Sequence, residues 1–327
     1  NARRGWGHQA NVAFLMSLRD DRLKKVSELN DGFLNPDYPQ QVIHSYYQAS
    51  LVFQFIEERY GFDVIRDMLR GYAEGRTTEE LFESLLGTPI TEFDDEFDDY
   101  MQDRFARPLA GLIQIAEPRP GPDDIEGMER FVLSHPGDLI GRLQLAVQLY
   151  RAERFDESEQ HFLTTLEIFP GFGGVDSPLW FIAQIQQGRG DLADAAQTLT
   201  QLTAISESHY RGMLTHSEIL AELGSQQESA DALDRAVLIW PYEMSLHERL
   251  AELHAELGNA PQAAIERAAV VALDPVDRAE ALYLLAVAQR EAGDPGEARR
   301  SVMDALSIAP NYEEALEFLL SLRGIGS

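Results

Sequence analysis

Hydrophobic residues recur along the chain with the spacing of amphipathic helices, and no segment of residues 1–108 alternates with the period of a strand. In that region the pattern predicts helices at about 8–19, 40–60, 62–73, 77–86 and 92–105, with a long loop around SELNDGFLNPDYP. Gly61 is expected to end the second of these helices and Thr77 to cap the fourth. The predicted fold class is therefore all-α.

The stretch HSYYQASLVFQFIEERYGF, residues 44–62, is unusually aromatic for a surface helix. Its apolar residues, taken with the one just before it, are Ile43, Tyr46, Tyr47, Leu51, Phe55 and Ile56. They cover more than one side of a helix, so the helix is expected to be buried among neighbours.

Prolines divide the C-terminal half at regular distances, at Pro136, Pro170, Pro241, Pro275 and Pro310. The successive gaps are 34, 71, 34 and 35 residues, and the gap of 71 holds two units, the first of which lacks its terminal proline. Each unit is predicted to form a helix, a turn and a second helix. A period of this length is typical of a solenoid of stacked helical pairs.

Small residues and glycines recur at fixed places within these units. The small residues are Ala146, Ala183, Ala251 and Ala286 on the first helix (helix A) and Ala195, Ala263 and Ala298 on the second (helix B), and the turn glycines are Gly190, Gly224, Gly258 and Gly293. This pattern resembles the tetratricopeptide repeat (TPR) family. Two units depart from it, with Glu153 in place of the turn glycine and Ser217 in place of the small residue on helix A.

The expected organisation has three parts. Residues 1–108 form a small helical domain, and residues 109–122 form a connector around the proline-rich EPRPGP. Residues 123–323 form a TPR-like solenoid of about five repeats, preceded by a lone helix B in DDIEGMERFVLSHP and closed by a capping helix in NYEEALEFLLSLRG.

The TPR resemblance implies that a partner would lie along the helices A. The positions this implies are Tyr150, Arg151, Trp180, Gln184, Gln187, Arg211, Glu218, Glu222, Glu248, Glu252, Glu256, Tyr283, Arg290 and Glu291, with Glu280 beside them. They are mostly acidic, whereas the subclass that holds carboxylate tails needs lysine and asparagine there. Two interpretations stay open: the groove receives a basic or mixed protein surface, or glutamate is frequent simply because it is a good helix former.

Charge narrows the class of partner. Residues 1–108 carry 12 basic and 20 acidic residues and residues 109–327 carry 15 and 35, for a formal net charge of -28. Such a field repels nucleic acid and attracts cationic partners, although a high charge also serves solubility alone. We therefore expect protein partners and no nucleic acid. There is also no uninterrupted apolar run of the length a transmembrane helix needs.

Two segments look like metal sites and are interpreted as structural. In HERLAELH the histidines His247 and His254 are seven residues apart, whereas a zinc motif needs them four apart, so packing positions are expected for both. The run EFDDEFDDY, residues 92–100, lacks the alternating aspartates and glycine of a calcium loop. Thr91 and Asp94 match a capping box there, which predicts an amphipathic helix with an acidic face.

Residues 1–105 resemble the downstream part of bacterial peptidase-MA-like metallohydrolases of the gluzincin type. The resemblance rests on LKKVSELNDGF, YYQASLVFQFIEERYG, IRDMLRGYAEGRTTEELF and LGTPITEFDDEFDDYM. In that family an HExxH helix and a later glutamate bind zinc, and this chain contains neither. No catalytic, metal or cofactor residue is carried over, and zinc is expected only if a catalytic segment precedes Asn1 in the gene product.

Two functions follow from these patterns. The first is a non-catalytic scaffold, an accessory subunit of a larger assembly, including a membrane-bound one, which docks through the acidic repeats. The alternative is the C-terminal portion of a zinc metallopeptidase. The absence of cysteine, the family resemblance and a start without methionine favour a processed bacterial protein outside the cytoplasm, in the periplasm.

Overall fold

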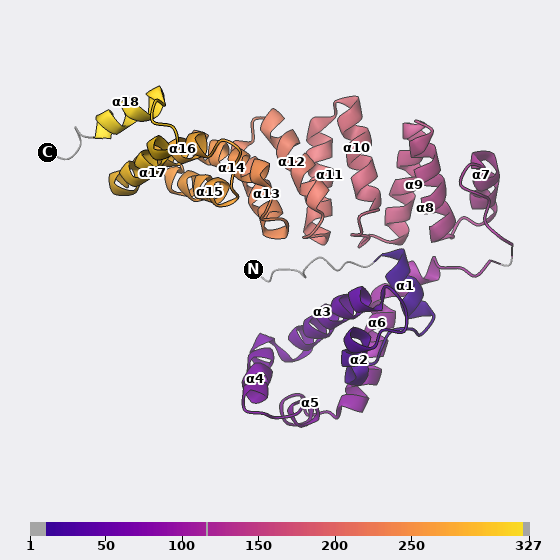
Figure 1. The fold of residues 1–327 in the computed structure, drawn as a ribbon. Coiled ribbons are helices and arrows are strands. Elements are labelled where there is room, and N and C mark those ends of the chain that lie inside the picture. The colour runs from indigo at the N-terminus through magenta and orange to yellow at the C-terminus, as the bar shows by residue number, and fades with distance from the viewer. Residues whose placement is uncertain (1–10, 116, 323–327) are drawn as a thin grey trace. The chain divides into compact units, whose positions relative to one another are not determined.

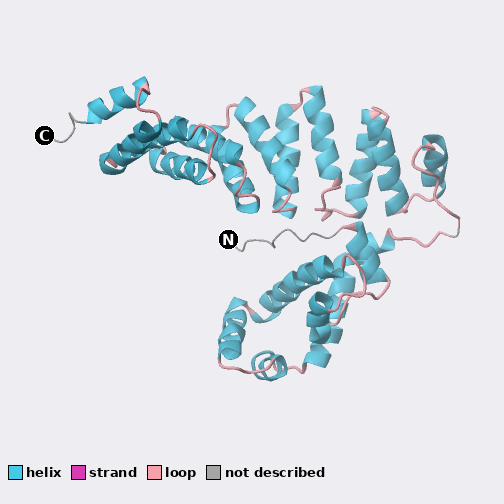
Figure 2. Ribbon diagram, in the orientation of Figure 1, coloured by secondary structure: helices cyan, strands magenta, loops and turns pink. Residues whose placement is uncertain are grey.

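The computed structural model describes residues 11–115 and 117–322, and every regular element within them is a helix (Figure 2). This confirms the all-α prediction. The chain divides into two compact units, one of residues 1–191 with 200–209 and the other of residues 192–199 with 210–327.

Unit 1 begins with the helices of the N-terminal region (Figure 1). They are α1 (Val12–Arg19), η1 (Val26–Glu28), α2 (Leu29–Leu34), α3 (Gln41–Tyr60), α4 (Phe62–Ala73), α5 (Thr78–Leu81), η2 (Phe82–Leu86) and α6 (Ile90–Ala110). The predicted turn residues are confirmed: Gly61 ends α3 with φ of 86°, and Thr77 caps α5 in a reciprocal capping box with Glu80. The predicted start of the first helix, residues 8–10, lies outside the described residues.

The segment SELNDGFLNPDYP was predicted as a long loop, and this is wrong because η1 and α2 lie within it. The predicted capping box at Thr91 is also wrong, since α6 already begins at Ile90. Asp94 instead accepts hydrogen bonds from the Ser27 backbone N–H at 3.0 Å and from the Ser27 hydroxyl at 2.6 Å. A buried carboxylate on α6 thus fixes the start of these two short helices.

An aromatic core holds the N-terminal helices together. Its fully or almost fully buried phenylalanines are Phe14, Phe55, Phe82, Phe93, Phe97 and Phe105. Phe93 lies at the centre, with its ring centroid 4.8 Å from that of Phe82 and 5.4 Å from that of Phe55. The Phe82–Phe93 pair is edge-to-face and the Phe55–Phe93 pair is tilted, and aromatic pairs of this kind stabilise a core beyond the area they bury.

Helix α3 is buried on one side only. Leu51, Phe55 and Ile56 lie in the core as predicted, but Ile43 and Tyr46 are 55% and 53% exposed, so the prediction that the whole helix is buried is wrong. The Phe33 ring, from α2, packs against Tyr46 at 4.8 Å and is the neighbour on that side. The outer face of α3 therefore keeps an apolar surface.

The aromatic core continues into the first repeat. Leu112, Leu139, Phe169 and Phe172 belong to the same buried cluster as the N-terminal phenylalanines. The carbonyl of Gly111 accepts a hydrogen bond from the Leu139 backbone N–H at 2.9 Å. The segment expected to be a connector is thus packed against the start of the repeats.

Unit 1 also contains the first helices of the solenoid. They are α7 (Ile125–Ser134), α8 (Leu139–Arg151), α9 (Phe155–Ile168) and α10 (Pro178–Arg189), followed by α11 (Leu192–Ile205), which both units share. In the first pair Ala146 is fully buried, and the hydroxyl of Ser158 donates to its carbonyl at 2.8 Å. Glu153 takes the left-handed turn conformation, with φ of 59°, that glycine provides in other repeats.

Unit 2 is built from three helical pairs and a final helix. The elements are α12 (Tyr210–Glu222), α13 (Gln226–Ile239), α14 (Met244–Glu256), α15 (Ala260–Ala272), α16 (Arg278–Glu291), α17 (Pro295–Ile308) and α18 (Glu313–Ser321). The turn glycines Gly224, Gly258 and Gly293 have φ between 73° and 85°, and the small residues Ala251, Ala263, Ala286 and Ala298 are at most 2% exposed. These features confirm the predicted TPR-type pairs.

Candidate partner-binding surface

The helices A of unit 2 present a row of carboxylates. Glu218 and Glu222 lie one turn apart on α12, and Glu248, Glu252 and Glu256 lie on successive turns of α14. All five side chains are exposed. Residues four apart share one face of a helix, so each set forms an acidic stripe.

Little positive charge lies against these stripes. Glu252 is 3.8 Å from a guanidinium nitrogen of Arg267, too long for a direct hydrogen bond. Within the described part of the chain, the other four glutamates have neither an ion pair nor a hydrogen-bond donor for their side chains. The stripes therefore keep a net negative charge that a partner could neutralise.

The predicted residues on α16 are partly covered by the last helix. The Tyr283 ring packs against Tyr312 at 5.2 Å and against Phe318 at 5.9 Å. The Arg290 guanidinium lies 4.7 Å from the centre of the Phe318 ring, a cation–π contact. Helix α18 thus occupies the place of a next repeat. Arg211, on α12, and Glu291 are exposed.

In unit 1 the predicted residues are mostly engaged with their own neighbours. Trp180 is only 8% exposed, and its ring lies 5.4 Å from that of His209, so it packs in the interior rather than facing a partner. Tyr150 lies 5.2 Å from Phe181 in the same way. Gln184 donates to Gln187 at 3.3 Å, and of the five residues predicted here Arg151 alone is fully exposed.

The two histidines of HERLAELH are buried between helices, as the repeat pattern predicts. Nδ1 of His247 lies 2.7 Å from a carboxylate oxygen of Glu266, and its Nε2 lies 3.0 Å from the carbonyl oxygen of Pro241. His254 lies 3.7 Å from Asp234. Burial raises the pKa of Asp234, and the charge of the nearby imidazole opposes that rise. Across residues 11–115 and 117–322, no three His, Asp or Glu side chains gather as a metal site would require.

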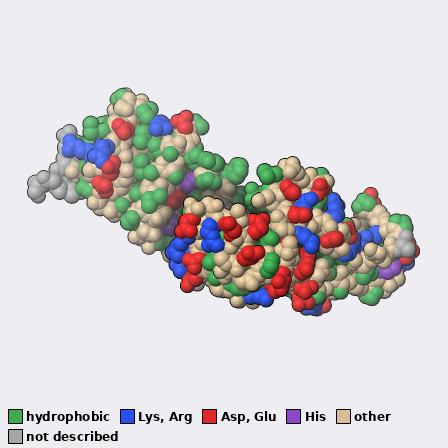
Figure 3. Space-filling model, turned by 90° about the horizontal axis from the view of Figure 1, so that it is seen from below, with side chains coloured by type: hydrophobic (Ala, Val, Ile, Leu, Met, Phe, Trp, Pro, Cys, Tyr) green, Lys and Arg blue, Asp and Glu red, His purple; other side chains and the backbone are tan. Residues whose placement is uncertain are grey.

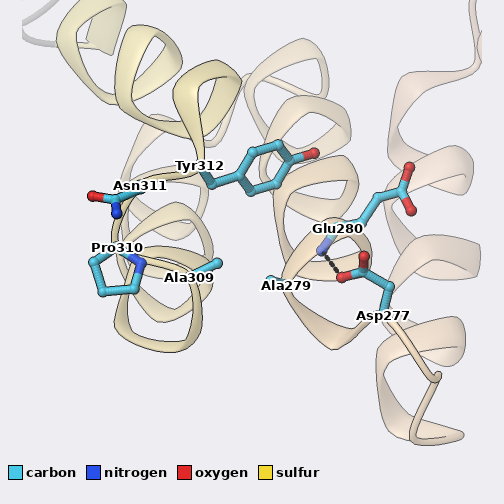
Figure 4. Close-up of a pocket in the computed structure, with 7 residues that line it drawn as sticks. All are labelled: Asp277, Ala279, Glu280, Ala309, Pro310, Asn311 and Tyr312. Atoms are coloured by element: carbon cyan, nitrogen blue, oxygen red, sulfur yellow. Dashed lines mark hydrogen bonds between the residues drawn. The ribbon is translucent and has the colours of Figure 1, made fainter.

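A hollow that the sequence analysis missed lies between the first turn of α16 and the turn from α17 to α18. It measures about 620 Å³ and is lined by Asp277, Ala279, Glu280, Ala309, Pro310, Asn311 and Tyr312 (Figure 4). The Tyr312 ring extends over it, and burial, followed by the charge of Glu280, raises the pKa of this tyrosine. The sequence signal was the segment DPVD, where Asp277 stands directly before a helix A.

Helix α15, the second helix of its pair, offers a contrasting surface. On α15 the exposed side chains include Pro261, Ile265 and Ala268, and none of these is charged. Unit 2, at the left of Figure 3, shows hydrophobic side chains interspersed with charged ones. No helix in the described ranges is both long enough and apolar enough to cross a lipid bilayer.

Comparisons with known proteins identify helical repeat structures. No family model matches the sequence, and no curated protein is similar to it. YrrB, described as a TPR protein with an unusual peptide-binding site, is 16% identical, with 59% of this chain and 97% of YrrB covered and a TM-score of 0.42. MamA is also 16% identical, over 52% of this chain and 90% of its own, with a TM-score of 0.38.

A third similar structure is TTC0263, a thermophilic TPR protein of Thermus thermophilus. It is 24% identical, with 56% of this chain and 98% of its own covered and a TM-score of 0.29. The left-handed turn glycines and the buried small residues of this chain are themselves the features of TPR-type helical pairs.

Proposed function

We propose that this protein is a non-catalytic interaction scaffold whose partner docks on the acidic stripes of α12 and α14. The observation that carries the proposal is the set of five solvent-accessible carboxylates with one distant cation among them. Exposed charges without partners cost little in water but attract a surface of opposite sign. The partner is therefore a protein with a basic or mixed surface.

We extend the proposal to the setting in which the scaffold works. A net charge of -28 suits an accessory subunit that binds a cationic surface of a larger assembly, including one that resides on a membrane. The proposed compartment is the bacterial periplasm. Binding by such stripes is expected to weaken as salt increases, because exposed charges are screened.

Photo-crosslinking in cells, from single positions on α14, tests the docking surface. A crosslinkable residue at position 252 is expected to capture a defined partner, and the double variant E218K/E222K is expected to abolish that capture. The matched control is E228K/D231K, which reverses two exposed acids on the neighbouring α13 and should leave capture intact. Equal capture by both double variants would exclude the acidic stripes as the docking surface.

The zinc-peptidase interpretation remains as a second proposal, and one observation favours it. Ile43, Tyr46 and Phe53 leave an apolar surface on the outer side of α3, as expected of a supporting wall that a further segment covers. Metal analysis of the complete gene product is the test. One tightly bound zinc per chain would favour the peptidase, and its absence would leave the scaffold.

A further inference from the structure

Two repeat junctions share a short motif. Residues 135–138 read His-Pro-Gly-Asp and residues 274–277 read Asp-Pro-Val-Asp, each directly before a helix A. Both aspartates cap their helix in the same way. The carboxylate of Asp138 accepts from the Gly141 backbone N–H at 2.9 Å, and that of Asp277 accepts from the Glu280 backbone N–H at 2.9 Å. The two carboxylates are thus equivalent in position and in role.

At the first junction the equivalent carboxylate holds an arginine. The Arg119 guanidinium donates two hydrogen bonds of 2.8 Å, one to each carboxylate oxygen of Asp138. The Asp138 side chain is completely buried under this contact. Such a bidentate pair combines charge with a fixed geometry. The structure therefore contains one occupied example of this site.

The segment that carries Arg119 makes two further contacts at the same junction. Gly111 accepts a hydrogen bond from the N–H of Leu139, the first residue of α8, a position that has no partner within its own helix. Leu112 shares a buried cluster with Phe172, the aromatic residue two places after the next proline. An amide, a carboxylate and an aromatic ring thus receive one polypeptide segment.

The fifth repeat has the same three features, and an open hollow lies beside them. Arg278 is the first residue of α16, Asp277 is its cap, and Tyr312 stands two places after Pro310. Asp277 and Tyr312 line the hollow of about 620 Å³, with Glu280 adding a second carboxylate (Figure 4). No basic side chain is among the lining residues. Within the described residues, the second carboxylate oxygen of Asp277 accepts no hydrogen bond.

From this equivalence we infer that the hollow docks an extended segment of a partner protein that carries an arginine, with the guanidinium on Asp277 and the ring of Tyr312 beside it. The inference rests on the proposed function, because it adds a second and more specific contact to the acidic repeats. Two carboxylates without a cation fit a guanidinium by charge, and an aromatic ring stabilises its flat face. Arginine is therefore the expected residue, ahead of lysine.

The test uses the chain's own segment as a probe supplied in trans. A labelled peptide with the sequence of residues 110–121, AGLIQIAEPRPG, is titrated into the full protein and followed by fluorescence anisotropy. We expect saturable binding that becomes about tenfold weaker when the peptide arginine is replaced by lysine, and weaker still with alanine. D277N is expected to weaken binding by about tenfold while keeping an oxygen that caps α16.

Matched variants make the result decisive. D294N changes another helix cap, at α17, which bonds the Glu297 N–H in the same way but lies outside the hollow, so it should bind the peptide like the wild type. E218K/E222K should also keep peptide binding, which separates this inference from the docking on α12 and α14. Equal affinity of wild type and D277N, or no binding at about 1 mM peptide, the weak limit of a measurable complex, would overturn the inference.

Self-association is the remaining outcome. If sedimentation shows a dimer of the protein that D277N dissociates, the hollow receives the connector of a second copy, and the assignment to a partner protein is wrong. A monomer that binds the peptide in a D277N-sensitive manner supports the assignment.

Discussion

The N-terminal helices pack against one another through large aromatic side chains, whereas the helical pairs of unit 2 pack through small ones. Around α6, helices of unequal length meet on large rings such as Phe93 and Phe97, both at most 1% exposed. In unit 2 each helical pair closes on small residues, such as Ala286 and Ala298, which are fully buried. Large rings fill irregular spaces, whereas small residues let regular helices approach closely.

Because of this difference, the two regions should respond differently to mutation. A single aromatic core spreads a defect over all the helices around it, whereas a repeat contacts mainly its neighbours. Mutations should therefore act on the whole N-terminal region in one case and on one or two repeats in the other. Mutating one region at a time tests that contrast.

The largest effect is expected for Phe93→Ala. Removal of this ring leaves a cavity between Phe55 and Phe82 and should lower the free energy of unfolding of the N-terminal helices by about 3–5 kcal/mol. Hydrogen–deuterium exchange should accelerate throughout α3, α4 and α6 together. Faster exchange confined to α6 would show that the core does not act as one body.

Ala286→Leu should have the next largest effect, about 1–3 kcal/mol, because the added methyl groups must enter the close contact between α16 and α17. Exchange should accelerate in α16, α17 and their immediate neighbours and stay unchanged in α12. Ala268→Leu, at an exposed position on α15, is the control and should be nearly neutral. An equal loss in both variants would argue against close packing at Ala286.

A smaller effect is expected at the repeat whose helix A carries serine. The Ser229 hydroxyl donates to the Ser217 carbonyl at 2.8 Å, and the two hydroxyls lie 2.8 Å apart. Ser229→Ala leaves a buried hydroxyl without its partner and should cost about 1–2 kcal/mol. The double variant S217A/S229A recreates the alanine pair of Ala251 and Ala263 and should recover most of that loss, as thermal denaturation can measure. Additive losses would contradict this.

The smallest expected effect is a gain in stability. Glu153 holds a left-handed conformation that is strained for a residue with a side chain, so Glu153→Gly should stabilise the first repeat by about 0.5 kcal/mol. Thermal denaturation gives the shift, and Gly258→Ala, the reverse exchange at an equivalent turn, should be destabilising. A loss of stability in Glu153→Gly would mean that the Glu153 side chain contributes more than the strain costs.

Sequence patterns predicted the repeats well because their determinants are local. A glycine with positive φ ends a helix wherever it stands, so Gly224, Gly258 and Gly293 could be placed without knowledge of the fold. The helices η1 and α2 were missed because the bond that fixes them joins Ser27 to Asp94, residues 67 apart in the chain. No local pattern contains that information.

The candidate site was predicted in part for the same reason. Counting along helix A found the accessible glutamates of α12 and α14, because exposure follows the helical period. It failed at Trp180, where the ring is covered by His209 from a later turn. It also missed the hollow beside Asp277, which exists only where the start of one helix meets the turn of the next repeat.

The contact between Gly111 and Leu139 also limits how such an array can evolve. The first repeat is joined to the N-terminal helices by a backbone hydrogen bond, by the Arg119–Asp138 pair and by a common apolar cluster. A repeat duplicated ahead of α8 would have to reproduce all three. Gene duplications that lengthen the protein are therefore expected to enter after α9, and relatives with longer arrays should keep arginine and aspartate at the first junction while varying in the number of pairs that follow.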